Sequence, residues 1–139
     1  MVNVAKVSPG VRLIDGAAPD ALKQVFAALD GPCWSAIDFV GAPQTAALGF
    51  DALAKGGKLV MVGLFGGAAP WSLPLVPMKA ASILGSYTGS LAELGELLEL
   101  ARAAVLPSVP IEARALDQAT QALEDLKAGR VVGRVVLTP

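Results

Sequence analysis

The sequence predicts an α/β fold in which helices flank a parallel sheet, and three observations support this prediction. Short β-branched runs alternate with stretches whose apolar residues recur at helical spacing. One run, residues 58–62, has no polar residue after its lysine, which is typical of a strand covered on both faces in the middle of a parallel sheet. Residues 36–62 read as strand, helix and strand within about thirty residues, the length of a βαβ unit.

A strand and a helix are expected first. Residues 11–15 form a short β-branched run closed by Gly16. Pro19 suits the first position of the helix that follows, and the Asp-Gly-Pro sequence at 30–32 ends it. The apolar residues of this helix follow the spacing i, i+3, i+4 and i+7 and form one stripe, namely Leu22, Val25, Phe26 and Leu29.

The βαβ unit supplies the next three elements. Its first strand covers residues 36–40. Its helix begins near Pro43 and is expected to end at Gly56 and Gly57, because glycine readily adopts the left-handed conformation found at helix C-termini. Its second strand is the apolar run 58–62.

Residues 68–79 are expected to form an extended loop or an edge piece, because three prolines in this segment prevent a complete central ladder. A strand at 82–87 follows. Ser90 and Glu93 have the spacing of a capping box, which opens a helix. The apolar stripe of this helix is wide and consists of Leu91, Leu94, Leu97, Leu98 and Ala101.

A strand, a helix and a strand are expected at the C-terminal end. The strands cover residues 111–116 and 131–138, and the helix begins at an Asp117 cap, continues through Leu126 and is followed by Gly129 as its C-terminal cap.

The composition excludes several classes of partner. Eleven basic and twelve acidic residues give a formal charge of −1, so neither nucleic acid nor an anionic membrane is expected to bind. The longest apolar stretches contain glycines and fall short of the ~20 residues that a membrane-spanning helix needs. The first residues lack the pattern of a secretory signal, so we expect a cytoplasmic protein.

The chain has one cysteine, Cys33, and no histidine. This composition excludes an intrachain disulfide, a Cys/His zinc site and any Ser-His or Cys-His catalytic pair within these residues. We interpret Cys33 as a buried or half-buried structural thiol.

Glycines recur at the ends of the expected apolar strands, at Gly41, Gly63, Gly66, Gly67, Gly85 and Gly89. In an open parallel sheet, ligands bind beyond the carboxyl ends of the strands, where glycine lets the backbone come close to them. The alternative is that these glycines only turn the chain, and this pattern by itself does not separate the two interpretations.

Four segments together resemble one known family. They are AIDFVG at 36–41, LAKGGKLVMVG at 53–63, ILGSYTG at 83–89 and LKAGRVVGRVVLT at 126–138. In this order and spacing they are similar to the medium-chain dehydrogenase/reductase superfamily, in particular to its zinc-type alcohol dehydrogenase family, over residues 11–139. The resemblance implies an N-terminally truncated, C-terminal portion of such an enzyme, with a partial Rossmann-like parallel sheet and a C-terminal strand-helix-strand segment.

The resemblance implies that two groups of residues border a nicotinamide cofactor, NAD or NADP. Val40 and Gly41 match positions beside the adenosine, and Val62, Gly63 and Leu64 match positions along the nicotinamide. In these roles the apolar side chains flank the rings, and the protein orients the cofactor that carries the chemistry. The alternative is that Val62 and Leu64 belong to the core of the sheet.

Three further positions complete the implied cofactor site. Ser86 and Thr88 match residues whose backbone holds the carboxamide. Arg134 matches a basic residue that reaches the pyrophosphate, where a guanidinium can pair with phosphate oxygens in fork geometry. The alternative for Arg134 is a solvated charge near a strand end.

The chain also departs from the family pattern. It has no Gly-x-Gly-x-x-Gly sequence before a helix, so the turn that receives the pyrophosphate is missing, and with it the residue that selects NAD or NADP. Zinc is not expected to bind, and binding of the cofactor by this chain alone is doubtful. We expect an N-terminal extension at 1–10, the partial cofactor domain at 11–106 and a segment at 107–139 that returns to the catalytic domain.

The function that follows is part of an NAD(P)-dependent oxidoreductase that transfers hydride between an alcohol or aldehyde and the cofactor. The isolated chain is expected to be inactive. Two alternatives stay open, a noncatalytic dimerisation or binding module derived from this family, and part of a zinc-free enzyme of the quinone reductase type.

The family also implies a surface that pairs two subunits. It covers residues 71–87, which begin at Trp71 and end at Tyr87 and include an expected edge strand. A homodimer or a pair with a full-length relative is therefore a possible partner arrangement. The alternative is a loop that packs over its own core.

Overall fold

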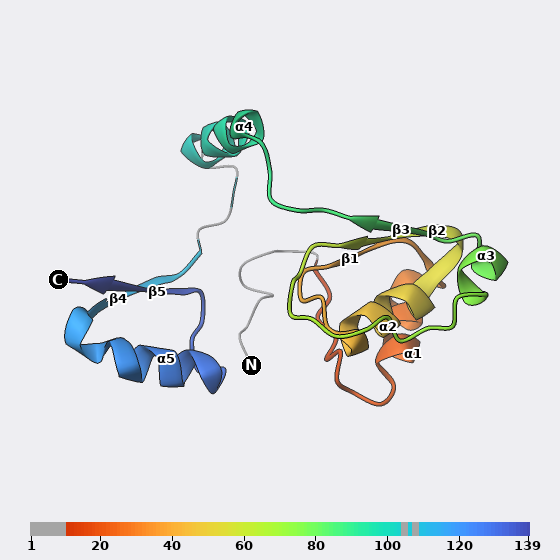
Figure 1. Ribbon diagram of the computed structural model, residues 1–139, viewed down its shortest axis with the longest axis horizontal. Helices are drawn as coiled ribbons and strands as arrows, with labels where there is room; N and C mark the ends of the chain where they lie inside the picture. Colours follow the sequence, from red (N-terminus) through yellow and green to blue (C-terminus); the bar gives the residue numbers. More distant parts are fainter. Residues whose placement is uncertain (1–10, 104–105, 107–108) are drawn as a thin grey trace. The chain divides into compact units, whose positions relative to one another are not determined.

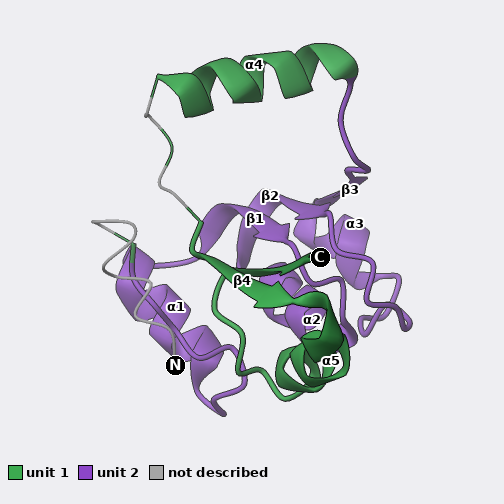
Figure 2. Cartoon of the chain, turned by 90° about the vertical axis from the view of Figure 1, so that its left-hand side faces the viewer, with its two compact units in different colours: residues 1–11, 91–139 green, residues 12–90 purple. Residues whose placement is uncertain are grey.

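The computed structural model describes residues 11–103, 106 and 109–139 (Figure 1). The chain divides into two compact units, which Figure 2 colours separately: residues 12–90 form one, and the described residues from Leu91 onward belong with Val11 to the other. Among the described residues, no helix is long and apolar enough to cross a membrane.

Residues 12–90 form a three-stranded parallel sheet with helices along one face. The strands lie in the order β1-β2-β3. The elements of this unit are α1 (Ala21–Leu29), β1 (Cys33–Asp38), α2 (Pro43–Ala52), β2 (Leu53–Met61), α3 (Leu75–Lys79) and β3 (Ser82–Gly85). The α/β class, the parallel pairing and the central position of residues 58–61 are therefore confirmed.

The core of this unit lies between α2 and the sheet. Phe50, Leu53 and Leu59 are buried, and Leu59 has no exposed surface. Gly49 lets α2 approach β2, because a Cβ atom at this position would lie 3.0 Å from the Leu59 Cδ1 atom. The ring of Trp71 stacks on Phe50 at a centroid distance of 4.7 Å, so this end of the 71–87 segment packs over the chain's own core.

Lys79 joins α3 to the end of α2. Its Nζ atom donates hydrogen bonds to the carbonyl oxygens of Phe50 at 2.7 Å and of Asp51 at 3.0 Å. It also lies 5.0 Å from the centre of the Phe50 ring. A cation in this place adds hydrogen bonds to carbonyls of the last turn and complements the negative end of the helix dipole.

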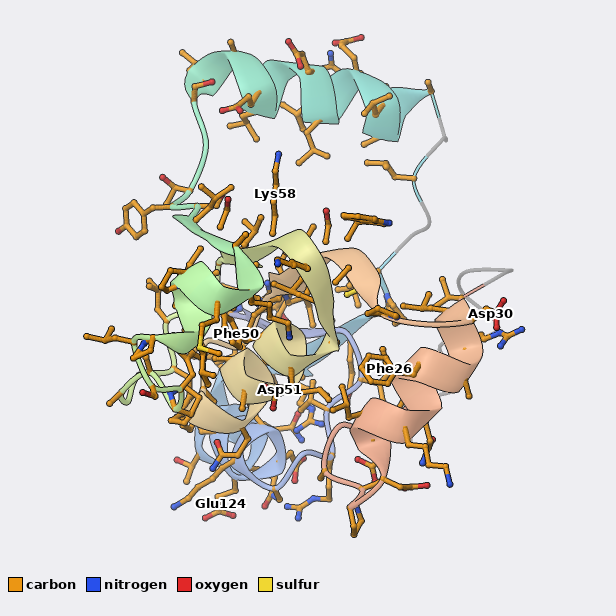
Figure 3. All side chains as sticks on the ribbon, turned by 90° about the vertical axis from the view of Figure 1, so that its right-hand side faces the viewer. Phe26, Asp30, Phe50, Asp51, Lys58 and Glu124 are labelled. Carbon is orange, nitrogen blue, oxygen red and sulfur yellow. The ribbon has the colours of Figure 1, made fainter. Side chains whose placement is uncertain are left out.

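The opposite face of the sheet is not covered by the helices of this unit. Side chains alternate between the two faces along a strand, so the sequence neighbours of the core residues point to the opposite face. Among these neighbours, Ile37 and Leu84 are about half exposed, at 57% and 46%. Lys58 projects from the sheet on the side away from Phe50 (Figure 3). The prediction that residues 58–62 are covered on both faces is therefore wrong for residues 12–90.

Three other sequence predictions are corrected. Residues 11–15 form no strand, because no described strand completes their backbone hydrogen bonds. Helix α2 ends at Ala52, before the Gly56-Gly57 pair, which lies in β2 where the register with β1 shifts. Residues 68–79 include the short helix α3, which tolerates Pro77 because the proline lies in its first turn.

The C-terminal unit contains the predicted strand-helix-strand segment. Its elements are α4 (Leu91–Arg102), β4 (Ile111–Ala115), the 3-10 helix η2 (Leu116–Gln118), α5 (Ala119–Lys127) and β5 (Arg134–Thr138), and β4 pairs with β5 in parallel. Strand β5 begins three residues later than predicted, after Gly133, whose φ is 84°. The leucine stripe of α4 is present on an exposed helix, since no residue of α4 is buried.

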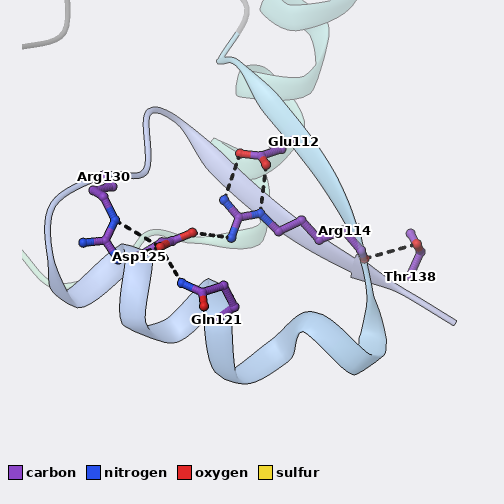
Figure 4. A network of polar contacts seen from close by, with 6 residues as sticks. All are labelled: Glu112, Arg114, Gln121, Asp125, Arg130 and Thr138. Atoms are coloured by element: carbon purple, nitrogen blue, oxygen red, sulfur yellow. Dashed lines mark hydrogen bonds and ion pairs between the residues drawn. The ribbon is translucent and has the colours of Figure 1, made fainter.

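A network of ion pairs ties α5 to β4 (Figure 4). Arg114 donates from Nη1 to the Asp125 carboxylate at 2.7 Å and from Nε to Glu112 at 2.8 Å. Arg130 donates to Asp125 at 2.7 and 3.1 Å, and Gln121 donates at 2.9 Å. Hydrogen bonds from Arg130, Arg114 and Gln121 hold the pKa of Asp125 well below its usual range.

We predict that Asp125→Asn lowers the free energy of unfolding at pH 7, because it leaves Arg114 and Arg130 without their shared carboxylate. The pKa of Asp125 is depressed in the folded chain, so the stabilisation is complete above the unfolded-state pKa near 3.8 and is lost as the pH falls below it. Urea unfolding at several pH values measures the difference, with Glu124→Gln on the same helix as the control. An equal loss at pH 7 and at pH 2 would contradict the ion-pair account.

Candidate functional site

The loops after β1 and β2 lie side by side at the carboxyl edge of the sheet. The backbone N–H groups of Val62 and Gly63 donate to the carbonyl of Asp38 at 2.9 and 3.0 Å. Further along, Phe65 donates to the carbonyl of Val40 and Gly66 to that of Gly41, both at 3.1 Å. The two loops therefore continue the parallel pairing of β1 and β2 beyond the ends of the strands.

Two glycines allow the loops to come this close. Gly41 has a φ of 72°, and a Cβ atom there would lie 2.0 Å from the carbonyl oxygen of Gly63. A Cβ atom on Gly63 would lie 2.1 Å from the carbonyl carbon of Val40. No side chain fits at either position, so these glycines serve the approach of two backbones as well as the turning of the chain.

The Asp38 side chain binds the loop that follows β1. This side chain is buried, with 6% of its surface exposed. Oδ1 accepts hydrogen bonds from the N–H groups of Val40 at 2.9 Å and Gly41 at 3.0 Å, and Oδ2 accepts one from the Thr45 hydroxyl at 2.9 Å. Burial alone raises the pKa of Asp38, but the bonds from Gly41, Val40 and Thr45 outweigh it and hold the pKa below its usual value.

The sequence analysis did not identify Asp38 as a site residue. The available signal was an acidic residue at the end of a strand, followed two residues later by Val-Gly, where an Asp side chain can accept from the backbone just ahead of it. The hydroxyl that binds Asp38 belongs to Thr45, seven residues further along the chain, and this spacing matches no recognisable motif.

A shallow hollow of about 240 Å³ opens between these loops and the start of α2. Most of the residues that line it are small or apolar: Gly41, Ala42, Pro43, Met61, Gly63, Leu64, Gly66, Gly67, Ala68 and Ala69. The hollow thus offers backbone and apolar surface at the edge where parallel sheets bind ligands.

The structure brings seven of the eight predicted cofactor residues to this edge. Val40 and Leu64 are exposed, while Val62 is half-buried. The N–H of Ser86 donates to the carbonyl of Met61 at 2.9 Å, so the backbone group that Ser86 can offer a ligand is its carbonyl oxygen. Thr88 has a φ of 52°, an unusual conformation for a β-branched residue.

Gly41 and Gly63 complete this group of seven, and Arg134 is the exception. It begins β5 in the C-terminal unit, and its N–H donates to the carbonyl of Pro110 at 2.9 Å. Arg134 thus belongs to a different unit from the other predicted residues.

The donor set of the chain does not fit zinc. Protein zinc sites use several cysteine, histidine or carboxylate ligands, whereas this sequence has one cysteine and no histidine. In the described part of the chain, no group of three or more Cys, Asp or Glu residues is placed to hold a metal ion.

A parallel α/β sheet with glycine-rich loops and a hollow at its carboxyl edge is the arrangement found in nucleotide-binding α/β domains. Comparison with known proteins identifies the family. A family model described as zinc-binding dehydrogenase matches residues 12–103, and the chain belongs to this family. It corresponds to the C-terminal, cofactor-domain part of medium-chain, zinc-type alcohol dehydrogenases.

Individual relatives agree with this assignment. An NAD-dependent alcohol dehydrogenase of Sulfurisphaera tokodaii is 28% identical over 139 residues, which cover 99% of this chain and 40% of that protein. One from Sulfolobus acidocaldarius is 35% identical over 102 residues, covering 73% of this chain and 30% of the relative. The crystal structure of the alcohol dehydrogenase from Aeropyrum pernix superimposes with a TM-score of 0.75 at 33% identity, covering 87% of this chain and 35% of that one.

We predict that Gly41→Ala lowers the free energy of unfolding by about 2–4 kcal/mol, because the new methyl group would overlap the Gly63 carbonyl and the residue would keep a left-handed φ. Urea unfolding followed by tryptophan fluorescence gives the value. Gly85→Ala is the matched control, since a Cβ atom there meets nothing within 4 Å, and its stability should change by less than about 1 kcal/mol. Equal effects of the two substitutions would show that the loops do not need the close approach.

Proposed function

We propose that this chain provides the second half of the cofactor site of an NAD(P)-dependent, alcohol dehydrogenase-like oxidoreductase. The observation that carries the proposal is the pairing of the loops after β1 and β2. The backbones of Gly41 and Gly63 are in close contact there, and the hollow lies beside them. The named relatives are NAD-dependent, and the chain spans about 40% of the length of the first of them.

Each loop has a separate task in this proposal. Val40 and Gly41 border the adenosine side, where small residues let the ligand approach the backbone. Val62, Gly63 and Leu64 lie along the nicotinamide, and the exposed Leu64 side chain supplies an apolar contact. When bound, the nicotinamide ring supplies the hydride acceptor or donor, and these residues contribute binding and orientation.

Two other regions complete the proposed site. The backbone of Ser86 and Thr88, after β3, receives the carboxamide through its polar groups. Arg134 pairs with the pyrophosphate, whose charge suits a guanidinium fork. Exchange between an alcohol and an aldehyde also needs a Lewis acid or another device at the substrate, and the residues of this chain do not supply zinc ligands. We therefore expect no turnover by the isolated chain.

We predict that NADH binds the chain weakly at the loop edge. Two-dimensional 1H–15N NMR should show shifts of the Gly41, Gly63 and Leu64 amides during a titration with NADH. Gly129 is the internal control: it also has a positive φ but lies in the C-terminal unit, outside the loops, so its amide should not shift. Arg134→Ala should weaken binding by about tenfold through the lost phosphate contact.

Arg102→Ala is the matched control for this titration, because Arg102 is exposed on α4 and pairs with Glu99 on the same helix. It should leave the NADH affinity unchanged. If millimolar NADH shifts none of the loop amides, the cofactor site is refuted for this chain.

A second function, dimerisation through residues 71–87, is favoured by the free edge of the sheet. All four residues of β3 are exposed, and among the described strands β3 pairs with β2 alone. Leu73 and Tyr87, in the same segment, are 81% and 76% exposed. A free strand with apolar neighbours is a ready surface for pairing with a second chain.

We predict that the chain forms a dimer at micromolar concentration and that Leu73→Lys weakens this dimer by about tenfold or more, since it places a charge in the apolar contact. Sedimentation velocity over a concentration series measures the change. Leu123→Lys is the control, because Leu123 is an exposed leucine on α5, outside the segment. A wild-type chain that stays monomeric at all concentrations would exclude this function.

A further inference from the structure

One residue is bonded to both loops of the candidate site. The Asp38 carboxylate accepts from the N–H groups of Val40 and Gly41, and the Asp38 carbonyl accepts from the N–H groups of Val62 and Gly63. Four of the residues expected to border the cofactor are therefore tied to a single residue that does not line the hollow itself.

The carboxylate binds the loop before α2 directly and also reaches the first turn of that helix. Helix α2 begins at Pro43, and Ala42 at its N-terminal cap position provides no side-chain hydrogen bond. The backbone donors to the Asp38 carboxylate are residues 40 and 41, which precede the helix, whereas its bond to α2 comes from the Thr45 hydroxyl and not from a backbone N–H. A role limited to helix capping would place an acceptor on the N–H groups of the first turn instead.

The cost of burying the carboxylate indicates that its position is needed. Transfer of an ionised carboxylate out of water is unfavourable unless hydrogen bonds replace its hydration. Here two backbone donors and the Thr45 hydroxyl do so, and Thr45 is held in turn by the N–H of Ala42 at 3.2 Å. An asparagine would retain one acceptor oxygen but would turn an N–H₂ donor toward Thr45 or toward the loop amides.

We propose that Asp38 is a positioning residue of the cofactor site: it holds Val40 and Gly41 against the loop of Val62 and Gly63, and so sets the shape of the hollow that receives the dinucleotide. This inference rests on the proposed function. Asp38 touches no ligand in this role, and it acts through the backbone of its neighbours.

The test compares NADH binding by the wild-type chain with binding by Asp38→Asn, using 1H–15N NMR. The variant should bind NADH about tenfold more weakly or worse, because the loop amides lose a charged acceptor. The Val40 and Gly41 amide protons should move upfield in the variant without NADH, whereas the amide of the buried Leu59 should keep its slow hydrogen exchange. That combination separates positioning of the loop from general unfolding.

Two further variants complete the experiment. Asp30→Asn is the matched control, because Asp30 is exposed and has a φ of 57°, which asparagine tolerates, so its NADH affinity should equal that of the wild type. Thr45→Val leaves the Asp38 side chain in place and removes one donor, and it should weaken NADH binding by about threefold. This variant carries the test if Asp38→Asn does not fold.

The outcomes distinguish the two proposals. If NADH shifts no loop amide of the wild-type chain, the proposed cofactor site is wrong, and the positioning role is overturned with it. If the wild type binds and both Asp38→Asn and Thr45→Val bind equally well, the cofactor site stands and the positioning role of Asp38 is overturned. Weaker binding with preserved Leu59 exchange supports both.

Discussion

The candidate site depends on the close approach of two backbones, the Val40-Gly41 peptide and Gly63. The distances leave no room for a Cβ atom on either glycine, and four backbone hydrogen bonds hold the two loops in parallel beyond the ends of β1 and β2. The hollow lies beside two loops that remain hydrogen-bonded to each other beyond the ends of the strands. Gly41 and Gly63, which line the hollow, lack side chains for the same reason, since a Cβ atom on either would overlap the facing backbone.

The two units are stabilised by different interactions. Residues 12–90 depend on apolar packing around Phe50, which contacts Trp71 on one side and Lys79 on another. The C-terminal unit has few buried apolar residues and instead concentrates charge on Asp125, which accepts from two arginines and a glutamine. In the first unit the pKa of Asp38 is also held below its usual value, so protonation of Asp38 lowers the stability of that unit as the pH falls.

Local patterns in the sequence were sufficient to predict most elements but not their partners. The leucine spacing predicted α4 and the βαβ pattern predicted β1, α2 and β2, because helical and strand periodicity are properties of adjacent residues. The run at 11–15 was misjudged, since a strand needs a neighbouring backbone that its own residues do not reveal. Asp38 was missed for a similar reason: its importance comes from Thr45 and from a second loop more than twenty residues away.

The backbone donors of the loop edge constrain what can bind there. The N–H groups of residues 40, 41, 62, 63, 65 and 66 all donate to Asp38 or to the neighbouring loop. None of these six amides is left to face an anion, unlike the amides of a glycine-rich phosphate loop at a helix N-terminus. The hollow therefore offers apolar and backbone surface and not a set of free amide donors from these residues. A phosphate group at this edge would therefore need a cation from outside these loops.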